Sequence, residues 1–258
     1  MISVIIPTYN SAEYIAETLE SVCAQTYRNI EILVIDDCSS DDTSEIVEKF
    51  AFKDPRICLI NLKENKGAAN ARNIGTKSAV GDWVAFLDSD DLWAPNKLEK
   101  QLNQINELVK LDENHIVSFV FTGSSFVDGY GKKLTSILHV PEKVDYKRLL
   151  KQNIISCSSV LIKRSLMLRY PMPCMNDIHE DFATWLQMLK EENIVAYGLD
   201  EPLLIYRITR SSRSGNKRKA ALMTYRTYRF IGLGIWASVK SWLFYAARSI
   251  RKYRKINP

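Results

Sequence analysis

Closely spaced carboxylates are the residues of this chain most suited to chemistry, because they can bind metal ions or accept protons. Asp88-Ser89-Asp90 places two carboxylates one residue apart, and Asp36-Asp37 and Glu180-Asp181 place them side by side. Two carboxylates on one loop can hold Mg²⁺ or Mn²⁺ through oxygen, with waters and substrate phosphates as further ligands. We therefore expect a metal site with Asp88 and Asp90 as ligands, although a solvated turn would also explain such a motif.

A second candidate lies at the start of a predicted helix, where Glu180 and Asp181 follow His179. Acids at this position cap a helix and interact favourably with its dipole, which is the structural explanation for the pair. The same position lowers the pKa of an aspartate, so we expect Asp181 to stay ionised and to accept a proton from a hydroxyl group. The fixed charge of Arg72 suits either a phosphate or a neighbouring carboxylate, and both roles stay open.

The elements that must position these residues alternate between strand and helix. Apolar runs predict strands at residues 2–6, 31–35, 57–61 and 83–87, and periodic stretches predict helices at 10–23, 45–52, 67–79 and 95–110. This order indicates an α/β fold with a mostly parallel central sheet and helices on both faces. Ligands bind outside the carboxyl ends of such strands, so the loops after all four strands should gather at one edge.

The second half of the chain has a different pattern. Residues 116–127, 156–162 and 203–208 predict strands, residues 128–143 an excursion rich in Gly, Lys and Pro, and residues 179–189 an amphipathic helix. Residues 209–219 predict a basic loop, and the remaining residues a basic, aromatic helical tail.

Composition excludes several classes of protein. The chain has 258 residues, of which 46% are hydrophobic and 25% charged, which is typical of a globular protein. Its five cysteines are scattered without a CxxC motif, so a disulfide scaffold or a zinc site is not expected and a cytoplasmic location fits. The N-terminus has neither the basic region nor the apolar length of a signal peptide or an anchor.

Charge is distributed unevenly along the chain. Residues 1–201 contain 21 basic and 30 acidic residues, a net charge of −9, whereas residues 202–258 contain 14 basic residues and no acid. Residues 230–247 carry a single charge, Lys240, and are short for a membrane span. Their basic flanks, together with Trp236, Trp242, Phe244 and Tyr245, favour a helix that lies on an anionic membrane surface. Packing on the catalytic domain is the alternative, and no nucleic-acid-binding module is recognisable, so we expect no nucleic acid as a partner.

Five motifs in order resemble a family 2 glycosyltransferase with the GT-A fold, of the bacterial surface-polysaccharide type. They are VIIPTYN at 4–10, VIDDCSSDDT at 34–43, NKGAANARNIG at 65–75, FLDSDD at 86–91 and EDFATWL at 180–186. The resemblance implies a UDP-sugar donor whose base and ribose contact Pro7 and Tyr9, and whose uracil edge hydrogen-bonds Asp36 or Asp37. It also implies a set of residues along the donor ribose and diphosphate, namely Lys66, Gly67 and Arg72.

The resemblance assigns the remaining roles to three loops. Asp88 and Ser89 would lie near the donor ribose or sugar, with Asp90 as the main ligand of Mn²⁺ or Mg²⁺. Asp181 would be the general base, with Glu180 hydrogen-bonding the acceptor or the donor sugar. Arg207 and the serines after it would close over the diphosphate, although Thr209 stands where the family often has His.

The implied reaction is a single displacement that inverts the configuration at the anomeric carbon, giving a β-glycoside from an α-linked UDP-sugar. By resemblance, the donor sugar is a hexose or N-acetylhexosamine, and the acceptor is a saccharide on a polyprenyl diphosphate, used in O-antigen or capsule synthesis. We expect a catalytic domain at 1–215, with a nucleotide-sugar half at 1–110 and an acceptor half at 111–215, and a membrane-association tail at 216–258. The enzyme would be cytoplasmic and peripheral at the inner face of the cell membrane. The alternatives are a sugar-phosphate nucleotidyltransferase, a two-carboxylate glycosidase and a non-catalytic membrane-attached partner.

Overall fold

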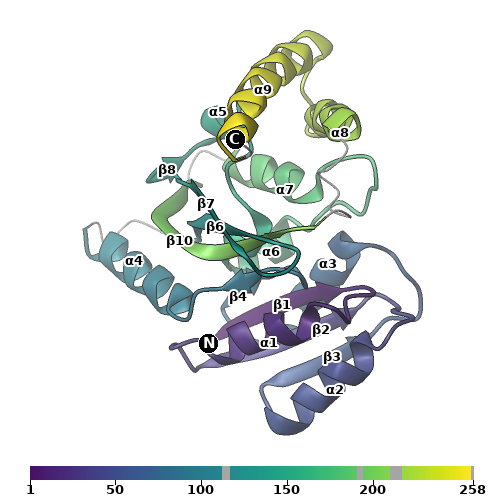
Figure 1. Ribbon diagram of the computed structural model, residues 1–258. Coiled ribbons are helices and arrows are strands. Elements are labelled where there is room, and N and C mark those ends of the chain that lie inside the picture. The colour runs from purple at the N-terminus through teal and green to yellow at the C-terminus, as the bar shows by residue number, and fades with distance from the viewer. Residues whose placement is uncertain (112–116, 191–193, 210–216, 257–258) are drawn as a thin grey trace.

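The computed structural model describes residues 1–111, 117–190, 194–209 and 217–256, and its centre is a ten-stranded mixed sheet (Figure 1). The strand order is β3-β2-β1-β4-β9-β6-β10-β5, with β7 beside β6 and β8 beside β10. The strands are β1 (Ile2–Thr8), β2 (Ile30–Asp36), β3 (Ile57–Asn61), β4 (Trp83–Phe86), β5 (Leu92–Trp93), β6 (Phe119–Asp128), β7 (Lys133–Leu138), β8 (Lys143–Val144), β9 (Leu161–Lys163) and β10 (Ala196–Ile208). The helices are α1 (Ile15–Cys23), α2 (Thr43–Lys53), α3 (Ala68–Ser78), α4 (Lys97–Leu111), α5 (Tyr146–Leu149), α6 (Arg164–Arg169), α7 (Glu180–Leu189), α8 (Lys217–Phe230) and α9 (Ile235–Ile256), with a 3₁₀ turn at Cys157–Ser159.

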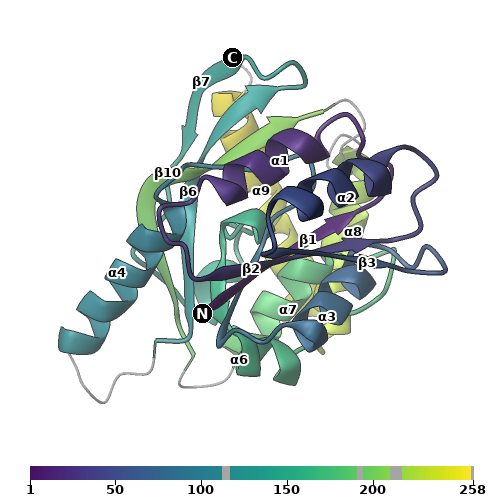
Figure 2. The same cartoon turned by 90° about the horizontal axis from the view of Figure 1, so that it is seen from below.

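Helices cover both faces of the sheet, as the alternation of side chains along buried strands requires. In β1, Val4 and Ile6 belong to the core beneath α1, α2 and α4, whereas Ile5 belongs to the core beneath α3, α6 and α7. Figure 2 shows α1 and α2 on one side of β1 and β2, and α3, α6 and α7 on the other. The predicted α/β architecture is confirmed.

The pairs among β1, β2, β3 and β4 and the pair β6–β10 are parallel, whereas the pairs that involve β5, β7, β8 and β9 are antiparallel. β1 pairs with β2 over seven residues and β6 pairs with β10 over nine, both in parallel, whereas β9 runs antiparallel between β4 and β6. In the register, Thr8 lies opposite Asp36 and Asp36 opposite Asn61. The loops after β1, β2 and β3 therefore gather at one edge of the sheet, as predicted.

Four predicted elements differ from the structure. α1 begins at Ile15 rather than near Asn10, because Asn10 has a φ of +48° and its side chain accepts the N–H of Ser40. The predicted strand at 156–162 is a 3₁₀ turn followed by β9, and β10 begins seven residues before the predicted position. The excursion at 128–143 contains β7, which pairs with β6.

The C-terminal helices α8 and α9 pack against the rest of the fold. Tyr228 of α8 is fully buried, its hydroxyl donates to the carbonyl of Leu150 at 2.5 Å, and its ring meets Phe182 of α7 edge-on. Among the described residues, no helix combines the length and apolar character that a membrane span needs. The predicted domain boundary at 215, part of the predicted loop at 209–219 and the predicted strand start at 116 lie outside the described residues.

Candidate active site

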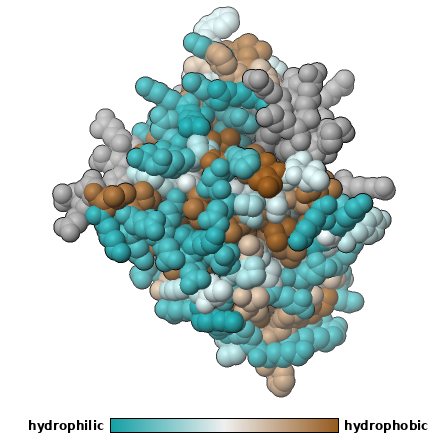
Figure 3. Space-filling model, turned by 60° about the vertical axis from the view of Figure 1, so that its left-hand side comes forward, coloured by the Kyte–Doolittle hydropathy of each residue, from teal (hydrophilic) through white to brown (hydrophobic). Residues whose placement is uncertain are grey.

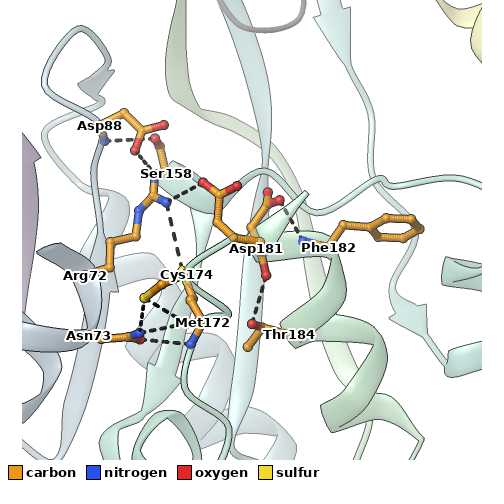
Figure 4. A network of polar contacts seen from close by, with 10 residues as sticks. Arg72, Asn73, Asp88, Ser158, Met172, Cys174, Asp181, Phe182 and Thr184 are labelled. Carbon is orange, nitrogen blue, oxygen red and sulfur yellow. Dashed lines mark hydrogen bonds and ion pairs between the residues drawn. The ribbon is translucent and has the colours of Figure 1, made fainter. Parts of the chain in front are cut away.

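Arg72 is the centre of the candidate site (Figure 4). It projects from α3, is only 4% exposed, and its Nη2 lies 2.5 Å from Asp88 Oδ1 while its Nη1 lies 3.1 Å from Glu180 Oε1. The two carboxylates come from the loop after β4 and from the first turn of α7. One buried guanidinium thus joins two of the predicted acidic groups. Of the two roles left open for Arg72, the structure therefore shows the pairing with carboxylates.

The Asp88–Asp91 loop concentrates negative charge at the edge of the sheet. Burial and the neighbouring Asp88 raise the pKa of Asp90 to about 6. Asp91 is 1% exposed, and burial, Asp88 and Asp90 raise its pKa well above the ordinary value. Among the described residues the Asp90 carboxylate forms no ion pair or side-chain hydrogen bond, and the nearby charge of Arg207 offsets its raised pKa only in part.

This loop fits a divalent cation that keeps several ligands from water or substrate. Asp88 and Asp90 repel each other, and a cation between them would relieve that repulsion. Within the described ranges no group of three or more His, Cys, Asp or Glu side chains forms a closed metal cage. Binding through one or two carboxylates plus a diphosphate is the mode that Mg²⁺ and Mn²⁺ use with nucleotides, and these residues suit it.

Arg207 lies against the backbone of the same loop. Its side chain is 2% exposed, its Nε donates to the carbonyl of Asp90 at 2.9 Å, and its Nη2 pairs with Glu17 of α1 at 2.5 Å. Its backbone N–H donates to Asp91 Oδ1 at 3.0 Å. In this arrangement Arg207 positions the acidic loop. Its predicted contact with a diphosphate stays a prediction, and the serines at 211 and 212 lie outside the described residues.

The two acids predicted to be catalytic, Glu180 and Asp181, lie in the first turn of α7, as predicted. Asp181 Oδ1 accepts the N–H of Phe182 at 2.7 Å, and burial together with the adjacent Glu180 raises the pKa of Asp181. Our expectation that the helix terminus would lower this pKa is therefore wrong, because desolvation and the like charge outweigh the dipole. Trp185, on the same helix, is fully buried and packs against Phe119.

α8 fixes the residue that precedes this pair. The backbone N–H of His179 donates to Thr227 Oγ1 at 3.0 Å, and the His179 ring nitrogen Nε2 lies 3.1 Å from the carbonyl of Ala220. Both partners belong to α8. The C-terminal segment therefore takes part in holding the turn that precedes Glu180 and Asp181.

The two acids after β2 hold neighbouring loops. Asp37 accepts the backbone N–H groups of Lys66 at 2.9 Å and Gly67 at 2.6 Å, while Asp36 accepts the hydroxyl groups of Ser39 and Ser44. Gly67 has a φ of +88°, a left-handed conformation that favours glycine and opens α3. The predicted uracil contact of either acid stays a prediction.

The other residues predicted to contact the UDP-sugar lie at the same edge of the sheet, at the carboxyl ends of the strands. Tyr9 is 49% exposed just after β1, whereas Pro7 is buried within the strand. Lys66 is exposed and pairs with Glu64 at 3.2 Å. Ser89 Oγ lies 2.7 Å from Ser11 Oγ, which joins the acidic loop to the loop after β1.

Sequence reasoning missed several residues of this site. Asp91, Ser158 and Glu17 were not selected, yet Ser158 Oγ accepts the N–H of Asp88 at 3.1 Å and Glu17 fixes Arg207. Asp91 had a signal, since it ends the same acidic run. Ser158 and Glu17 had none, because their contacts join positions 70 and 190 residues apart.

The sequence profile described as "Glycosyl transferase family 2" matches residues 3–166. The chain belongs to this family. Family 2 membership makes it a glycosyltransferase, of the hexosyltransferase class of its relatives, and decides against the nucleotidyltransferase and glycosidase alternatives.

Full-length relatives resemble this family 2 chain throughout. A Bacillus subtilis protein named as the teichuronic acid biosynthesis glycosyltransferase TuaG is 40% identical over 98% of this chain and 97% of its own. Two Escherichia coli proteins, WfgD and WfaP, are 38% and 34% identical, over 85% and 98% of this chain and 81% and 95% of their own. Both are named as UDP-Glc:α-D-GlcNAc-diphosphoundecaprenol β-1,3-glucosyltransferases.

Solved structures agree on the fold. Staphylococcus aureus TarS 1–349 with UDP-GlcNAc has a TM-score of 0.70 at 22% identity, covering 93% of this chain and 70% of the TarS chain. The mannosyltransferase PcManGT from Pyrobaculum calidifontis, in complex with GDP-Man and Mn²⁺, has a TM-score of 0.64 at 22% identity, covering 96% of this chain and 75% of its own. This similarity confirms the predicted GT-A-like architecture.

Proposed function

We propose that this chain transfers glucose from UDP-glucose to an N-acetylglucosamine unit on a polyprenyl diphosphate, with inversion, to form a β-1,3 bond. WfgD and WfaP, which share a third or more of its sequence over most of its length, are named for this reaction. The relation to TuaG supports a product of the bacterial surface-polysaccharide type. The lipid-linked acceptor would bring the enzyme to the cytoplasmic face of the membrane.

The observation that carries the proposal is the pair of contacts made by Arg72. Two parts of the proposed site meet at this buried cation. One is the loop expected to hold the donor diphosphate, and the other is the turn that carries Asp181, the proposed general base. Arg72 Nε is itself buried and has no hydrogen-bond partner among the described residues, so the fixed charge of the guanidinium is balanced by these two carboxylates.

The proposed mechanism is a single in-line displacement. Asp181 takes the proton of an acceptor hydroxyl group, the resulting oxygen attacks the anomeric carbon, and the bond to the UDP oxygen breaks on the opposite face. The raised pKa of Asp181 makes its carboxylate a stronger base, closer to the working pH. Inversion of an α-linked donor gives the β-glycoside.

Asp90 and Asp88 would hold the divalent cation, which supplies positive charge to the leaving diphosphate. Arg207 and Thr18 keep the loop in place for this role, since both donate hydrogen bonds to its backbone carbonyls. Arg72 adds a fixed positive charge beside Asp88.

The test is UDP release from UDP-glucose, UDP-galactose, UDP-GlcNAc and UDP-GalNAc, with Mn²⁺ or EDTA, and with a synthetic GlcNAc-diphosphate-lipid acceptor. We expect release that requires UDP-glucose, the metal and the acceptor together, and an NMR coupling constant of the product that identifies a β linkage. Release with another donor alone would overturn the glucose assignment. An α-linked product would overturn the displacement mechanism.

A further inference from the structure

Helix α9 exposes a row of large apolar side chains. Trp236 is 86% exposed, Ile235 59%, Leu243 57% and Phe244 52%. Trp236, Leu243 and Phe244 are seven and eight residues apart, so they share one face of the helix with Lys240. Figure 3 shows apolar residues gathered at the top of this view, the end of the molecule that α9 forms in Figure 1.

The opposite face of α9 is bound to the protein. Trp242 Nε1 donates to the carbonyl of Ala221 at 2.7 Å, and the ring of Tyr245 packs against Phe182 of α7 at 5.8 Å between centroids. The helix is therefore held in a fixed orientation, and its apolar outer face is not explained by the core.

A basic hollow lies where α9 meets α5 and β8. It has a volume of about 590 Å³, and five basic side chains line it, namely Lys143, Lys147, Arg148, Lys151 and Arg248. Asp145 is the single acid in its lining. A smaller hollow of about 320 Å³ shares Arg148 and Arg248 with it. Neither hollow includes a residue of the candidate active site.

The positive charge of the C-terminal segment favours an anionic partner for this surface. No acidic residue follows Glu201 in the sequence, and α9 continues after Arg248 with Arg251, Lys252, Arg254 and Lys255. Apolar side chains beside clustered Lys and Arg are the combination that binds the interface of an anionic bilayer. A nucleic acid would use the basic residues but would leave the apolar row without a partner.

We propose that the outer face of α9 and the basic hollow beside it form one docking surface for an anionic phospholipid bilayer. Trp236, Leu243 and Phe244 enter the headgroup region, and the hollow receives lipid phosphates. This proposal rests on the proposed function, since it places the enzyme where a lipid-linked acceptor is found. It also goes beyond the sequence-based expectation, because four of the five lysines and arginines come from β8, α5 and the residues just after α5 rather than from the tail.

The surface is connected to the catalytic turn by direct contacts. α9 holds α8 through Trp242, and α8 holds His179 through Thr227. A bilayer at α9 is therefore one helix pair away from Glu180 and Asp181, a position suited to an acceptor whose lipid stays in the membrane.

The test is co-sedimentation of the full chain with vesicles, without donor or acceptor. We expect binding to phosphatidylcholine vesicles that contain phosphatidylglycerol, and at least about tenfold weaker binding to phosphatidylcholine alone. The variant K147Q/R148Q/K151Q should weaken binding about 10- to 100-fold, since each basic residue near an anionic surface contributes. The variant W236S/L243S/F244S should weaken it by at least about tenfold.

Helix α2, at the opposite end of the molecule, supplies matched controls. Phe52 is 94% exposed there, and Lys49 and Lys53 are exposed beside it, so F52S and K49Q/K53Q should leave vesicle binding unchanged. Equal binding to neutral and anionic vesicles, or full binding by either α9 or hollow variant, would overturn the proposal. Because the measurement needs no turnover, and because the variants should keep UDP release with a water-soluble acceptor, failure here is distinct from failure of the proposed function.

Discussion

Arg72 and Glu180 lie 108 positions apart in the sequence, yet Nη1 of the first is 3.1 Å from Oε1 of the second. With the second contact to Asp88, this ion pair fixes α7 to the loop after β4. The guanidinium of Arg72 therefore holds the two acidic parts of the site together without a substrate or a metal ion.

Replacing Arg72 with Met should destabilise the fold, because Asp88 and Glu180 would lose their shared counter-charge. Removing one partner of a buried ion pair typically lowers the free energy of unfolding by about 3–5 kcal/mol. Because Asp88 is partly exposed, we expect a decrease of about 3 kcal/mol. Urea unfolding measures it. The control R56M removes the more exposed pair with Asp54 and should cost about 1 kcal/mol or less.

Replacing Asp181 with Asn should remove turnover and leave donor binding intact. A lost general base typically lowers kcat by about 10²- to 10⁴-fold, while the Asp88–Asp91 loop and Arg72 are unchanged. UDP release and calorimetric UDP-sugar binding separate the two effects. D177N, which affects a half-exposed pair with Arg226 three residues before α7, is the matched control and should retain activity.

The pH profile of kcat/KM should have an acid limb above the ordinary aspartate pKa of 3.8, since burial and Glu180 raise the pKa of Asp181. Activity is lost as pH falls through this raised pKa, because the base becomes protonated. The variant E180Q removes the like charge beside Asp181, so the acid limb of its kcat/KM profile should lie at lower pH. This shift is expected even if the maximal kcat/KM of the variant is reduced. An unchanged limb in E180Q would contradict the assigned cause.

Replacing Asp90 with Asn should stabilise the metal-free protein near neutral pH. The pKa of Asp90 rises from 3.8 to about 6 on folding, so the folded state loses stability as pH rises from about 4 through 6. D90N removes this loss, by roughly 1 kcal/mol after allowance for partial exposure. The control D82N, at an exposed position, should change little.

Addition of Mn²⁺ with UDP should make the wild-type protein more stable than the D90N variant. A ligand that binds only the folded state adds about 2.7 kcal/mol at a concentration 100 times its Kd. With Mn²⁺ and UDP, the Tm of the wild-type protein should therefore rise and that of D90N should not. An equal rise in both would remove Asp90 from the metal site.

Replacing Thr227 with Val should lower kcat and leave the KM for the UDP-sugar nearly unchanged. The variant leaves the N–H of His179 without its acceptor, so the turn that carries Asp181 is held less firmly. We expect a decrease of about 10- to 100-fold, the scale of a small misplacement of a catalytic group. T227S keeps the hydroxyl group and should restore the rate, which a purely structural role in the core would not predict.

The fold of residues 1–110 was predictable from the sequence because its strands are apolar throughout. Buried parallel strands leave continuous runs such as residues 31–35, and their shared direction brings the following loops to one edge. The acidic loop was placed in this way, whereas Arg72 was selected for its fixed charge and the start of α7, in the second half, for its adjacent acids. Their partners were not assigned, since Arg72 suits a phosphate as well as a carboxylate.

The second half was harder, because its structure depends on contacts between distant residues. Arg207 was expected at a diphosphate, but Glu17, 190 positions away, and the carbonyl of Asp90 hold its guanidinium. β10 continues through Asp200-Glu201-Pro202, which resembles a strand end, by means of two irregularities in its pairing with β6. Residues 156–162 contain a turn because Ser158 and Ser159 bind Trp93, Gln101 and the N–H of Asp88.

The two faces of α9 should diverge at different rates as the family evolves. Trp242 and Tyr245 are constrained by α8 and by Phe182, so a change at either needs a compensating change in the protein. Trp236, Leu243 and Phe244 are more than half exposed, and they are not among the described residues that pack against the core cluster. Under the docking proposal, their replacement is limited only by the membrane of the host, so relatives in organisms with different lipids should keep the inner face and vary the outer one.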